Sequence, residues 1–385
     1  MVGAGVFAVW GPAAGAAGSA LLVGLVLAGA VAFANATSSA DLAAAHPESG
    51  GTYVYARERL GPGWGHLAGW GFVVGKTASS AAMALTVGAY LWPGRERAVG
   101  LVAIAAIAVV NLRGITRTAT VTKWLLVASL GVLVVVVVAG WAGGSADPAR
   151  LAPDTWDTAG VLRAAAFCFF AFAGYARIAT LGEEVVDPEV TIPRAIPLAL
   201  GLVLVLYLVV GVTVVATVPI EAVATSDAAL GLVVGPGGWQ VLVRAGAGIA
   251  ALGVLLNVLA GISRTVLAMA RRRELPHLLA KVAPRHAVPA RAELTVVAVS
   301  AVLVLTLDLG QAIGFSAMTV LTYYALTNAS ALRLADHERR WPRAVPLAGL
   351  VGCVVLAIAL PPATVAAGVV VLAIGAGIRR SSPAR

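Results

Sequence analysis

Long apolar runs, cut by charge clusters and turn residues, follow one another along nearly the whole chain. A helix that spans a membrane needs about 20 mostly apolar residues. Runs near that length predict about twelve transmembrane helices, the first of them short. They cover residues 1–15, 19–45, 64–91, 98–112, 119–141, 162–186, 192–218, 238–269, 292–307, 312–334, 345–360 and 363–378. The pattern therefore predicts an all-α integral membrane protein.

The composition agrees with this prediction. Hydrophobic residues make up 60% of the 385 positions, charged residues only 12%, and the mean hydropathy is +0.92. A soluble core does not need that much apolar surface. Cys168 and Cys353 both lie inside apolar runs without metal-ligand spacing, so we interpret them as small buried hydrophobic residues. Neither a metal site nor a cofactor is expected.

The positions of the 27 basic residues predict an orientation. Lysine and arginine accumulate in short loops on the cytoplasmic side. Nineteen of them fall on one side if the loop after the second segment is cytoplasmic, and five fall on the other. Both chain ends are then cytoplasmic and the protein resides in the cell membrane. The net charge of +9 reflects this topology, so the lipid bilayer is an expected partner and nucleic acid is not.

Small or flexible residues interrupt the first and the sixth segments at corresponding places. Residues 3–7 read Gly-Ala-Gly-Val-Phe, and residues 169–175 read Phe-Phe-Ala-Phe-Ala-Gly-Tyr. Either stretch alone is explained by close helix packing. Together they indicate an inverted-repeat transporter with broken helices 1 and 6. The N–H groups that start a half-helix suit a carboxylate and the freed carbonyls suit an ammonium group, so a zwitterionic amino acid meets both demands.

Several further motifs occur in a fixed order. After residues 3–7 come Asp41-Leu42, the run from His46 to Tyr55 (His-Pro-Glu-Ser-Gly-Gly-Thr-Tyr-Val-Tyr), the sixth segment ending in Glu183-Glu184, then residues 187–188 and 192–196, and finally residues 263–264, 268–271 and 275–276. With these motifs the chain resembles the amino acid–polyamine–organocation superfamily of permeases, which have a leucine-transporter-like fold. The resemblance implies one transporter domain over residues 1–385. It comprises inverted repeats of five helices at 1–141 and 160–334, and two peripheral helices at 345–378.

The resemblance also implies a function and a solute site. The function is secondary active transport of an amino acid or related small amine by alternating access, coupled to a proton, a sodium ion or a counter-solute. The backbone of Val2, Gly3, Ala4 and Gly5 would bind the solute carboxylate. The ammonium group and the aliphatic part would lie against Phe170, Ala171 and Ala173. An alternative for Phe170 is an aromatic side chain that faces lipid or core.

The chain departs from the family pattern in its first helix. The cytoplasmic half of helix 1 is expected before Gly3, where only two residues stand. The expectation is therefore a helix 1 that lacks this half. One explanation is a start at an internal Met1 of a longer protein, and the other is a shortened paralogue.

Other departures concern intramembrane charge. Ser129 stands where proton-coupled relatives carry a buried lysine, and it cannot carry that charge. Arg177 and Lys76 lie within apolar segments, where a charge is expensive and is a functional-site candidate. Arg177 alternatively forms an ion pair with Glu183 or Glu184, which themselves either relay protons or end the segment. Lys76 alternatively extends into a vestibule.

The sequence also bears on two other classes of function, an intramembrane enzyme and a protein that does not transport. An intramembrane enzyme needs a nucleophile with a base, or a metal triad, at membrane depth. The sequence contains no HExxH, GxSxG or P-loop motif, and its five histidines fall in predicted loops or at helix ends. An enzyme is therefore not expected. A transport-inactive truncated paralogue or scaffold stays open as the alternative.

Overall fold

The computed structural model describes residues 3–46, 50–114, 119–153, 156–175, 188–283 and 286–381. These residues form an all-helical protein in which an isolated bridge between Ala283 and Val288 is the one β-type pairing. Val2, Arg177, Glu183 and Glu184 lie outside the described residues.

Within its described residues, the first half of the chain forms seven α-helices. They are α1 (Gly5–Ala8), α2 (Trp10–Ala17), α3 (Leu21–Ala45), α4 (Thr52–Leu60), α5 (Pro62–Leu91), α6 (Glu96–Leu112) and α7 (Ala119–Ala142). Short 3₁₀ turns follow α2 and α7, namely η1 (Gly18–Ala20) and η2 (Pro148–Leu151).

The second half begins with α8 (Thr158–Phe172) and the 3₁₀ turn η3 (Ala173–Tyr175). The helices that follow are α10 (Pro188–Thr217), α11 (Ile220–Ala224), α12 (Ala229–Val233), α13 (Gly238–Arg271), α14 (Ala290–Thr306), α15 (Leu309–Ala331), α16 (Ala344–Ala359) and α17 (Pro362–Ser381). The turns η5 (His277–Ala280) and η6 (Asp336–Glu338) follow α13 and α15.

Among the residues that the structure describes, six stretches are long and apolar enough to cross a membrane. They are Trp10–Ala45, Pro62–Leu91, Lys123–Ala142, Arg194–Thr217, Gly238–Arg271 and Pro362–Arg379. Thr158–Phe172 and Ala344–Ala359 are shorter apolar helices. The integral membrane class predicted from the hydropathy pattern is thus supported. Three short helices of the described residues, α4, α11 and α12, lie in stretches that the hydropathy pattern assigned to loops. Helix α4 was not predicted because it is short and carries charged residues.

The interruption of the first segment is a bend at Val9, between α1 and α2, where the backbone keeps right-handed helical torsions. Pro12 explains this position, because proline lacks the N–H that would bind the Ala8 carbonyl and its ring crowds the preceding turn. The predicted Gly-Ala-Gly stretch instead leads into α1, which starts at Gly5.

The sixth segment stops being α-helical where the sequence predicted its break. Asp157 starts α8 by accepting hydrogen bonds from the backbone N–H groups of Ala159 and Gly160, at 3.0 and 2.9 Å. The helix ends at Phe172, where the Ala173 N–H binds the Phe170 carbonyl and the chain tightens into η3.

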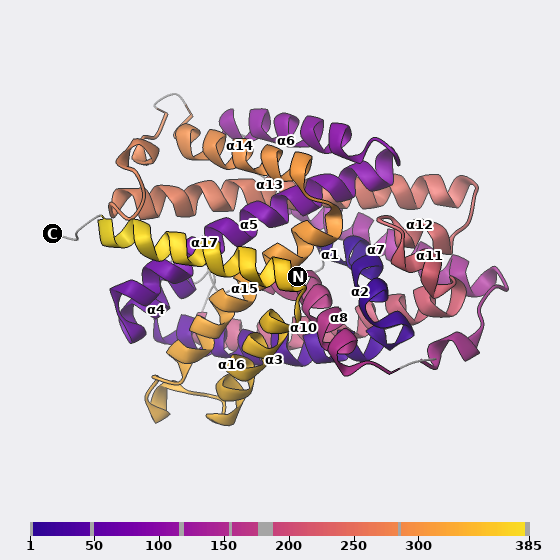
Figure 1. The fold of residues 1–385 in the computed structure, drawn as a ribbon, viewed down its shortest axis with the longest axis horizontal. Coiled ribbons are helices and arrows are strands. Elements are labelled where there is room, and N and C mark those ends of the chain that lie inside the picture. The colour runs from indigo at the N-terminus through magenta and orange to yellow at the C-terminus, as the bar shows by residue number, and fades with distance from the viewer. Residues whose placement is uncertain are drawn as a thin grey trace.

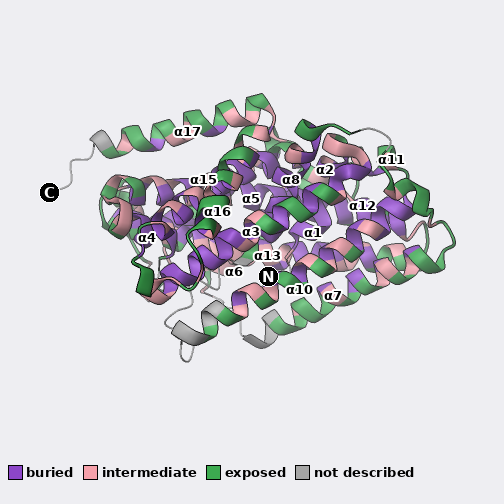
Figure 2. Ribbon diagram, turned by 90° about the horizontal axis from the view of Figure 1, so that it is seen from below, coloured by how far each residue is buried: buried purple, intermediate pink, exposed green. Residues whose placement is uncertain are grey.

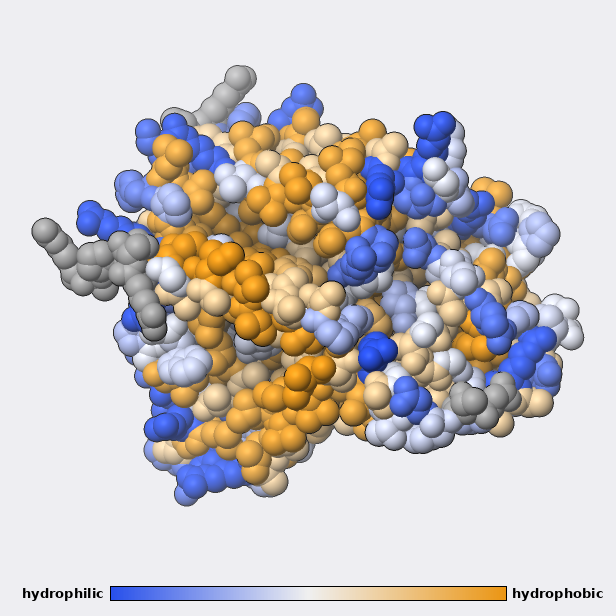
Figure 3. All heavy atoms as spheres, in the orientation of Figure 1, coloured by the Kyte–Doolittle hydropathy of each residue, from blue (hydrophilic) through white to orange (hydrophobic). Residues whose placement is uncertain are grey.

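The helices form one bundle with α4 at one end and α11 and α12 at the other (left and right in Figure 1). Helix α5 packs against both α13 and α15, and α3 packs against α8 and α10. Helix α17 lies on the outside of the bundle and is mostly exposed, whereas α8 lies in the interior (Figure 2). Broad apolar patches cover the middle of the face shown in Figure 3, and polar side chains gather toward the two ends.

Helix α16 is tied to the bundle by buried polar contacts. Asn328 of α15 donates to the side-chain oxygen of Asn35 in α3 at 2.6 Å and accepts from Ser38 at 2.8 Å. The Cys353 thiol of α16 reaches the same Asn35 oxygen at 3.3 Å. Both cysteines are free and buried, which confirms their interpretation as small buried residues. Of the two helices expected to be peripheral, α17 is the more exposed.

Candidate functional site

The two interrupted segments meet at Gly5 and Ala171. A Cβ atom added to Gly5 would lie 2.6 Å from the Cα atom of Ala171 and 3.3 Å from its nitrogen. No real Cβ atom approaches backbone that closely, so the contact requires glycine. The start of α1 and the end of α8 are therefore in direct contact, although 166 positions separate the two residues.

Two buried tyrosines bind carbonyls that these helix ends leave free. The Tyr207 hydroxyl of α10 donates to the Ala171 carbonyl at 3.3 Å and also meets the backbone of Gly3. The Tyr90 hydroxyl of α5 donates to the Phe7 carbonyl at 2.9 Å. The Trp10 indole N–H binds the Val6 carbonyl. A broken helix must find such partners because its freed carbonyls cannot reach water inside a bilayer.

Tyr90 and Tyr207 were not predicted as part of this region. Each is an isolated tyrosine within a long apolar run. A hydroxyl at such a depth needs a partner, and this was the one available signal. The runs alone do not say which carbonyl the hydroxyl meets.

The predicted solute-site residues that the structure describes lie together at this junction. Ala4, Gly5, Ala171 and Ala173 are buried, Phe170 is 9% exposed, and Gly3 is half-buried. Of the phenylalanines of α8, Phe169 packs edge-on against Tyr324 and Phe172 contacts Tyr207. Phe170 is the most exposed of the phenylalanines in this helix.

The candidate residues for intramembrane charge lie on different helices. Lys76 is half-buried in the middle of α5, and within the described ranges no hydrogen bond or ion pair reaches its ammonium group. Ser129 of α7 donates to the Leu125 carbonyl of its own helix at 2.7 Å. Arg264 is exposed on α13, two turns before that helix ends at Arg271.

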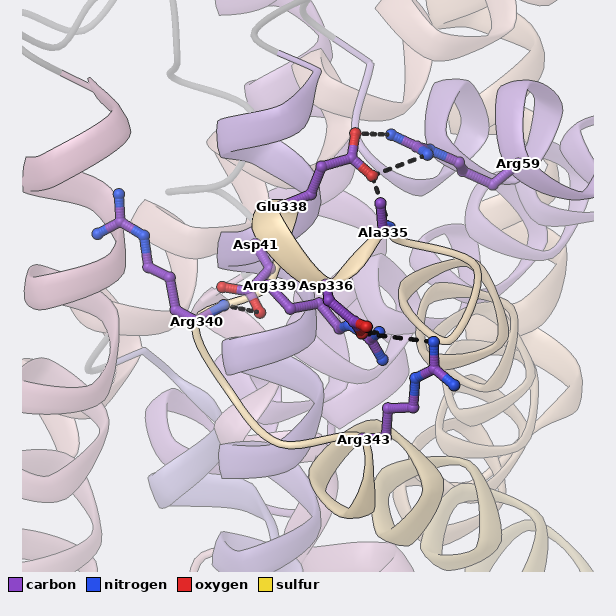
Figure 4. A network of polar contacts seen from close by, with 8 residues as sticks. All are labelled: Asp41, Arg59, Ala335, Asp336, Glu338, Arg339, Arg340 and Arg343. Atoms are coloured by element: carbon purple, nitrogen blue, oxygen red, sulfur yellow. Dashed lines mark hydrogen bonds and ion pairs between the residues drawn. The ribbon is translucent and has the colours of Figure 1, made fainter.

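An ion-pair network joins the end of the bundle that carries α4. Arg57 of α4 pairs with Glu274, just after α13, and Tyr53 donates to the same carboxylate at 2.7 Å. Arg59 makes two hydrogen bonds to Glu338 of η6, at 2.6 and 3.1 Å (Figure 4). Helix α4 is thus held to both the α13 end and the α15–α16 loop.

Arg59 has an electrostatic consequence for Glu338. The hydrogen bond from its guanidinium, assisted by the Ala335 N–H, holds the pKa of the Glu338 carboxyl below its ordinary 4.5. Nearby, the Arg340 N–H donates to Asp41 at 3.3 Å, and Asp336 pairs with Arg339 and Arg343 (Figure 4).

A cavity of about 490 Å³ opens at the other end of the bundle. It is lined by both signs of charge, with Arg95, Glu96, Arg97, Asp227 and Asp308 around it. Partial desolvation and the neighbouring carboxylates of Asp308 and Glu96 raise the pKa of Asp227 above its ordinary 3.8.

Comparison with known proteins decides the family. A family model described as amino acid permease matches residues 1–378. The chain belongs to the amino acid permease family, within the amino acid–polyamine–organocation superfamily. The permease is 55% identical over 390 residues to an uncharacterized transporter of Mycobacterium tuberculosis, with 99% of this chain and 88% of that protein aligned.

More distant relatives carry substrate names. The branched-chain amino acid permease BcaP of Bacillus subtilis is 25% identical, over 91% of this permease and 81% of BcaP. Human cationic amino acid transporter 4 is 28% identical, over 89% of this permease and 58% of that protein. The permease is therefore a transporter of amino acid type, as the sequence motifs predicted, and not an enzyme.

Proposed function

We propose that this permease is a secondary active transporter that carries an amino acid or related small amine across the cell membrane by alternating access. The solute binds where the start of α1 meets the end of α8. The observation that carries the proposal is the contact of Gly5 with Ala171, because it brings opposite helix ends together. The positive end of α1 suits the carboxylate of a zwitterion, and the carbonyl end of α8 suits its ammonium group.

The proposed site consists of Val2, Gly3, Ala4, Gly5, Phe170, Ala171 and Ala173. The close approach of Gly5 to Ala171 supports its inclusion in the proposed site, and the half-buried Gly3 is the more accessible backbone position. Phe170 borders the site with its ring. The names of BcaP and of the cationic transporters support an amino acid as the solute.

The proposed architecture is twelve spanning helices, with inverted repeats at 1–141 and 160–334 and two additional helices at 345–378. Interruptions in the first and sixth spans support the repeat. We place the α4 end in the cytoplasm, since Arg57, Arg59, Arg339 and Arg340 gather there. Both chain termini then lie in the cytoplasm.

The proposed coupling is to a proton carried by Lys76, with sodium or a counter-solute as alternatives. Ser129 cannot carry a charge, and Lys76 is the half-buried ionisable group on α5. A lysine can release its proton when it is desolvated, whereas an arginine such as Arg177 effectively never does.

Binding to the purified protein and uptake into proteoliposomes test the proposal together. A ligand that binds the folded state raises the apparent thermal stability, so a screen of amino acids and amines identifies the solute. Phe170→Ala is expected to weaken binding and uptake of that solute at least about tenfold, the loss of roughly 1.4 kcal/mol of contact. Phe169→Ala is the matched control, because that ring packs against Tyr324 in the core.

The outcomes are distinct. The control is expected to lower thermal stability but to leave the solute affinity of the folded protein unchanged. Equal effects of the two variants on affinity would remove Phe170 from the site. A failure of every amino acid and amine to bind or enter would favour a transport-inactive paralogue or scaffold.

A further inference from the structure

Lys76 faces the seam between α13 and α15. Residues four and seven positions apart lie on one face of an α-helix. Four positions before Lys76, Phe72 contacts Tyr323 of α15, with ring centroids 5.5 Å apart. Seven positions before it, Gly69 packs closely against Met269 of α13. Lys76 shares this face with both.

The same face continues toward the proposed solute site. Tyr90 lies fourteen positions after Lys76, which is close to four helical turns, and it binds the Phe7 carbonyl in α1. Lys76 therefore lies on the side of α5 that faces α1. It is nearer than Tyr90 to the start of α5, the end of this helix that follows α4. Its side chain is half-buried, and no hydrogen bond or ion pair of the described residues reaches it.

Two carboxylates close to this seam already have partners. Glu274, just after α13, pairs with Arg57, and Glu293 of α14, the helix that Ser80 of α5 contacts, accepts a hydrogen bond from Asn111.

Within the described ranges of α1, α2, α5, α8, α13 and α15 there is no aspartate or glutamate. The basic residues on them are Lys76, Arg163, Arg244, Arg264 and Arg271. Arg163 donates to the Ala359 carbonyl at 3.2 Å and Arg244 to the Tyr90 carbonyl at 2.8 Å. Arg163 and Arg244 are half-buried as well, but of the half-buried basic residues of this set Lys76 is the one without a hydrogen bond or ion pair among the described residues.

From this arrangement we infer that the permease carries amino acids whose side chains bear no positive charge, and that Lys76 excludes lysine, arginine and similar cations. The inference narrows the proposed function and rests on it. An unpaired cation in a site of low dielectric repels a second cation, and no carboxylate on the described parts of these helices offsets that repulsion. Amino acids with neutral or acidic side chains escape it.

The expected size of the effect follows from Coulomb's law. For an assumed separation of about 10 Å between the Lys76 ammonium group and the charged end of a bound lysine or arginine, and an effective dielectric constant of about 20, the repulsion weakens binding on the order of tenfold. Discrimination of this size is measurable between solutes of the same shape.

Two matched pairs of solutes provide the test on the wild-type protein. Citrulline has nearly the shape of arginine without its charge, and norleucine is lysine without the terminal ammonium group. We expect citrulline and norleucine to bind, and to inhibit uptake of the best solute in proteoliposomes, at least about tenfold more strongly than arginine and lysine. Thermal shifts of the purified full chain and competition for uptake are the two measurements.

Three variants assign the exclusion to Lys76. Lys76→Gln is expected to reduce the citrulline-to-arginine ratio about tenfold, because the repelling charge is gone. Lys76→Arg keeps the charge and should keep the ratio. Lys123→Gln removes an exposed lysine of α7 and is the control that should also keep it.

The results separate this inference from the proposed function. Equal binding of arginine and citrulline by the wild type would overturn the inference and leave amino acid transport intact. If the Lys76→Gln variant keeps the wild-type citrulline-to-arginine ratio, as the Lys123→Gln control does, the role of Lys76 is overturned. Absence of binding by all four solutes and every other amino acid would overturn both proposals.

Discussion

Gly5 packs directly against the backbone of Ala171, so that a Cβ atom on Gly5 would lie 2.6 Å from the Ala171 Cα atom. This contact joins two helix ends that are far apart in the sequence. Its neighbours Tyr90 and Tyr207 bind carbonyls of the same two segments. The junction is therefore both closely packed and hydrogen-bonded, and substitutions can test each property separately.

The packing is tested by Gly5→Ala. We expect this variant to lose about 1 to 3 kcal/mol of stability, because one methyl group cannot fit without moving the backbone of α8. Gly201→Ala is the control, since a Cβ atom at Gly201 in α10 meets nothing within 4 Å. Thermal unfolding in detergent compares the two. Equal stability of both variants would contradict the close contact.

The hydrogen bonding is tested by Tyr207→Phe. Removal of the hydroxyl leaves the buried Ala171 carbonyl without this partner, which should cost about 1 to 3 kcal/mol. Thr306→Val removes a hydroxyl from an exposed position of α14 and should change the unfolding temperature little. A Tyr207→Phe variant as stable as the Thr306→Val variant would show that the Tyr207 hydroxyl does not stabilise the helix end.

The ion pair of Arg59 and Glu338 should make stability depend on pH. The bond lowers the folded-state pKa of Glu338, so its contribution is present above the unfolded-state value near 4.5 and is lost as pH falls through the folded-state value. Arg59→Ala should therefore lower stability at pH 7 and flatten the decline at acidic pH. For a partly exposed pair the expected coupling is on the order of 0.5 kcal/mol.

A charge exchange checks this pair. The double variant Arg59→Glu with Glu338→Arg should recover part of the stability that each single variant loses at pH 7. The pair of Arg343 with Asp336 is the control, because both of its side chains are largely exposed. Additive losses in the Arg59 and Glu338 variants would mean that the pair contributes no net coupling.

Asp227 should have the opposite pH dependence. Its raised folded-state pKa means that its contribution to stability is full below about 3.8 and is lost as pH rises through the folded-state value. Asp227→Asn is thus expected to raise the unfolding temperature at pH 7. The unfolding temperature of this variant should also increase less on mild acidification than that of the wild type. Glu221→Gln, at an exposed position of α11, is the control. Identical pH profiles for wild type and Asp227→Asn would contradict the assignment.

Proton coupling by Lys76 predicts a change in transport. Lys76→Met should make uptake independent of pH, since methionine carries no proton, and Lys76→Arg should do the same, since arginine keeps its proton. The Lys123→Gln control should retain the wild-type pH profile. Wild-type pH dependence of uptake in both Lys76 variants would exclude this residue as the proton carrier.

The sequence by itself determined the class of the protein, most of its helices and its family. Hydropathy is a property of consecutive residues, so apolar runs located α3, α5, α10 and α13 closely. The end of α8 near residues 171–174 also followed from local composition. Helix α4 did not, because a short helix with charged residues owes its stability to the partners it packs against.

Only the tertiary structure decided which residues meet. Nothing local in the runs that contain Tyr90 and Tyr207 says which freed carbonyl each hydroxyl binds. Gly5 was singled out because it lacks a side chain, but its partner Ala171 depends on how α1 and α8 pack. Arg57 and Arg59 were predicted as charges of one loop, whereas their partners Glu274 and Glu338 come from segments more than 200 residues away. Helix packing is specified by the complementary shapes of distant surfaces, which no local pattern contains.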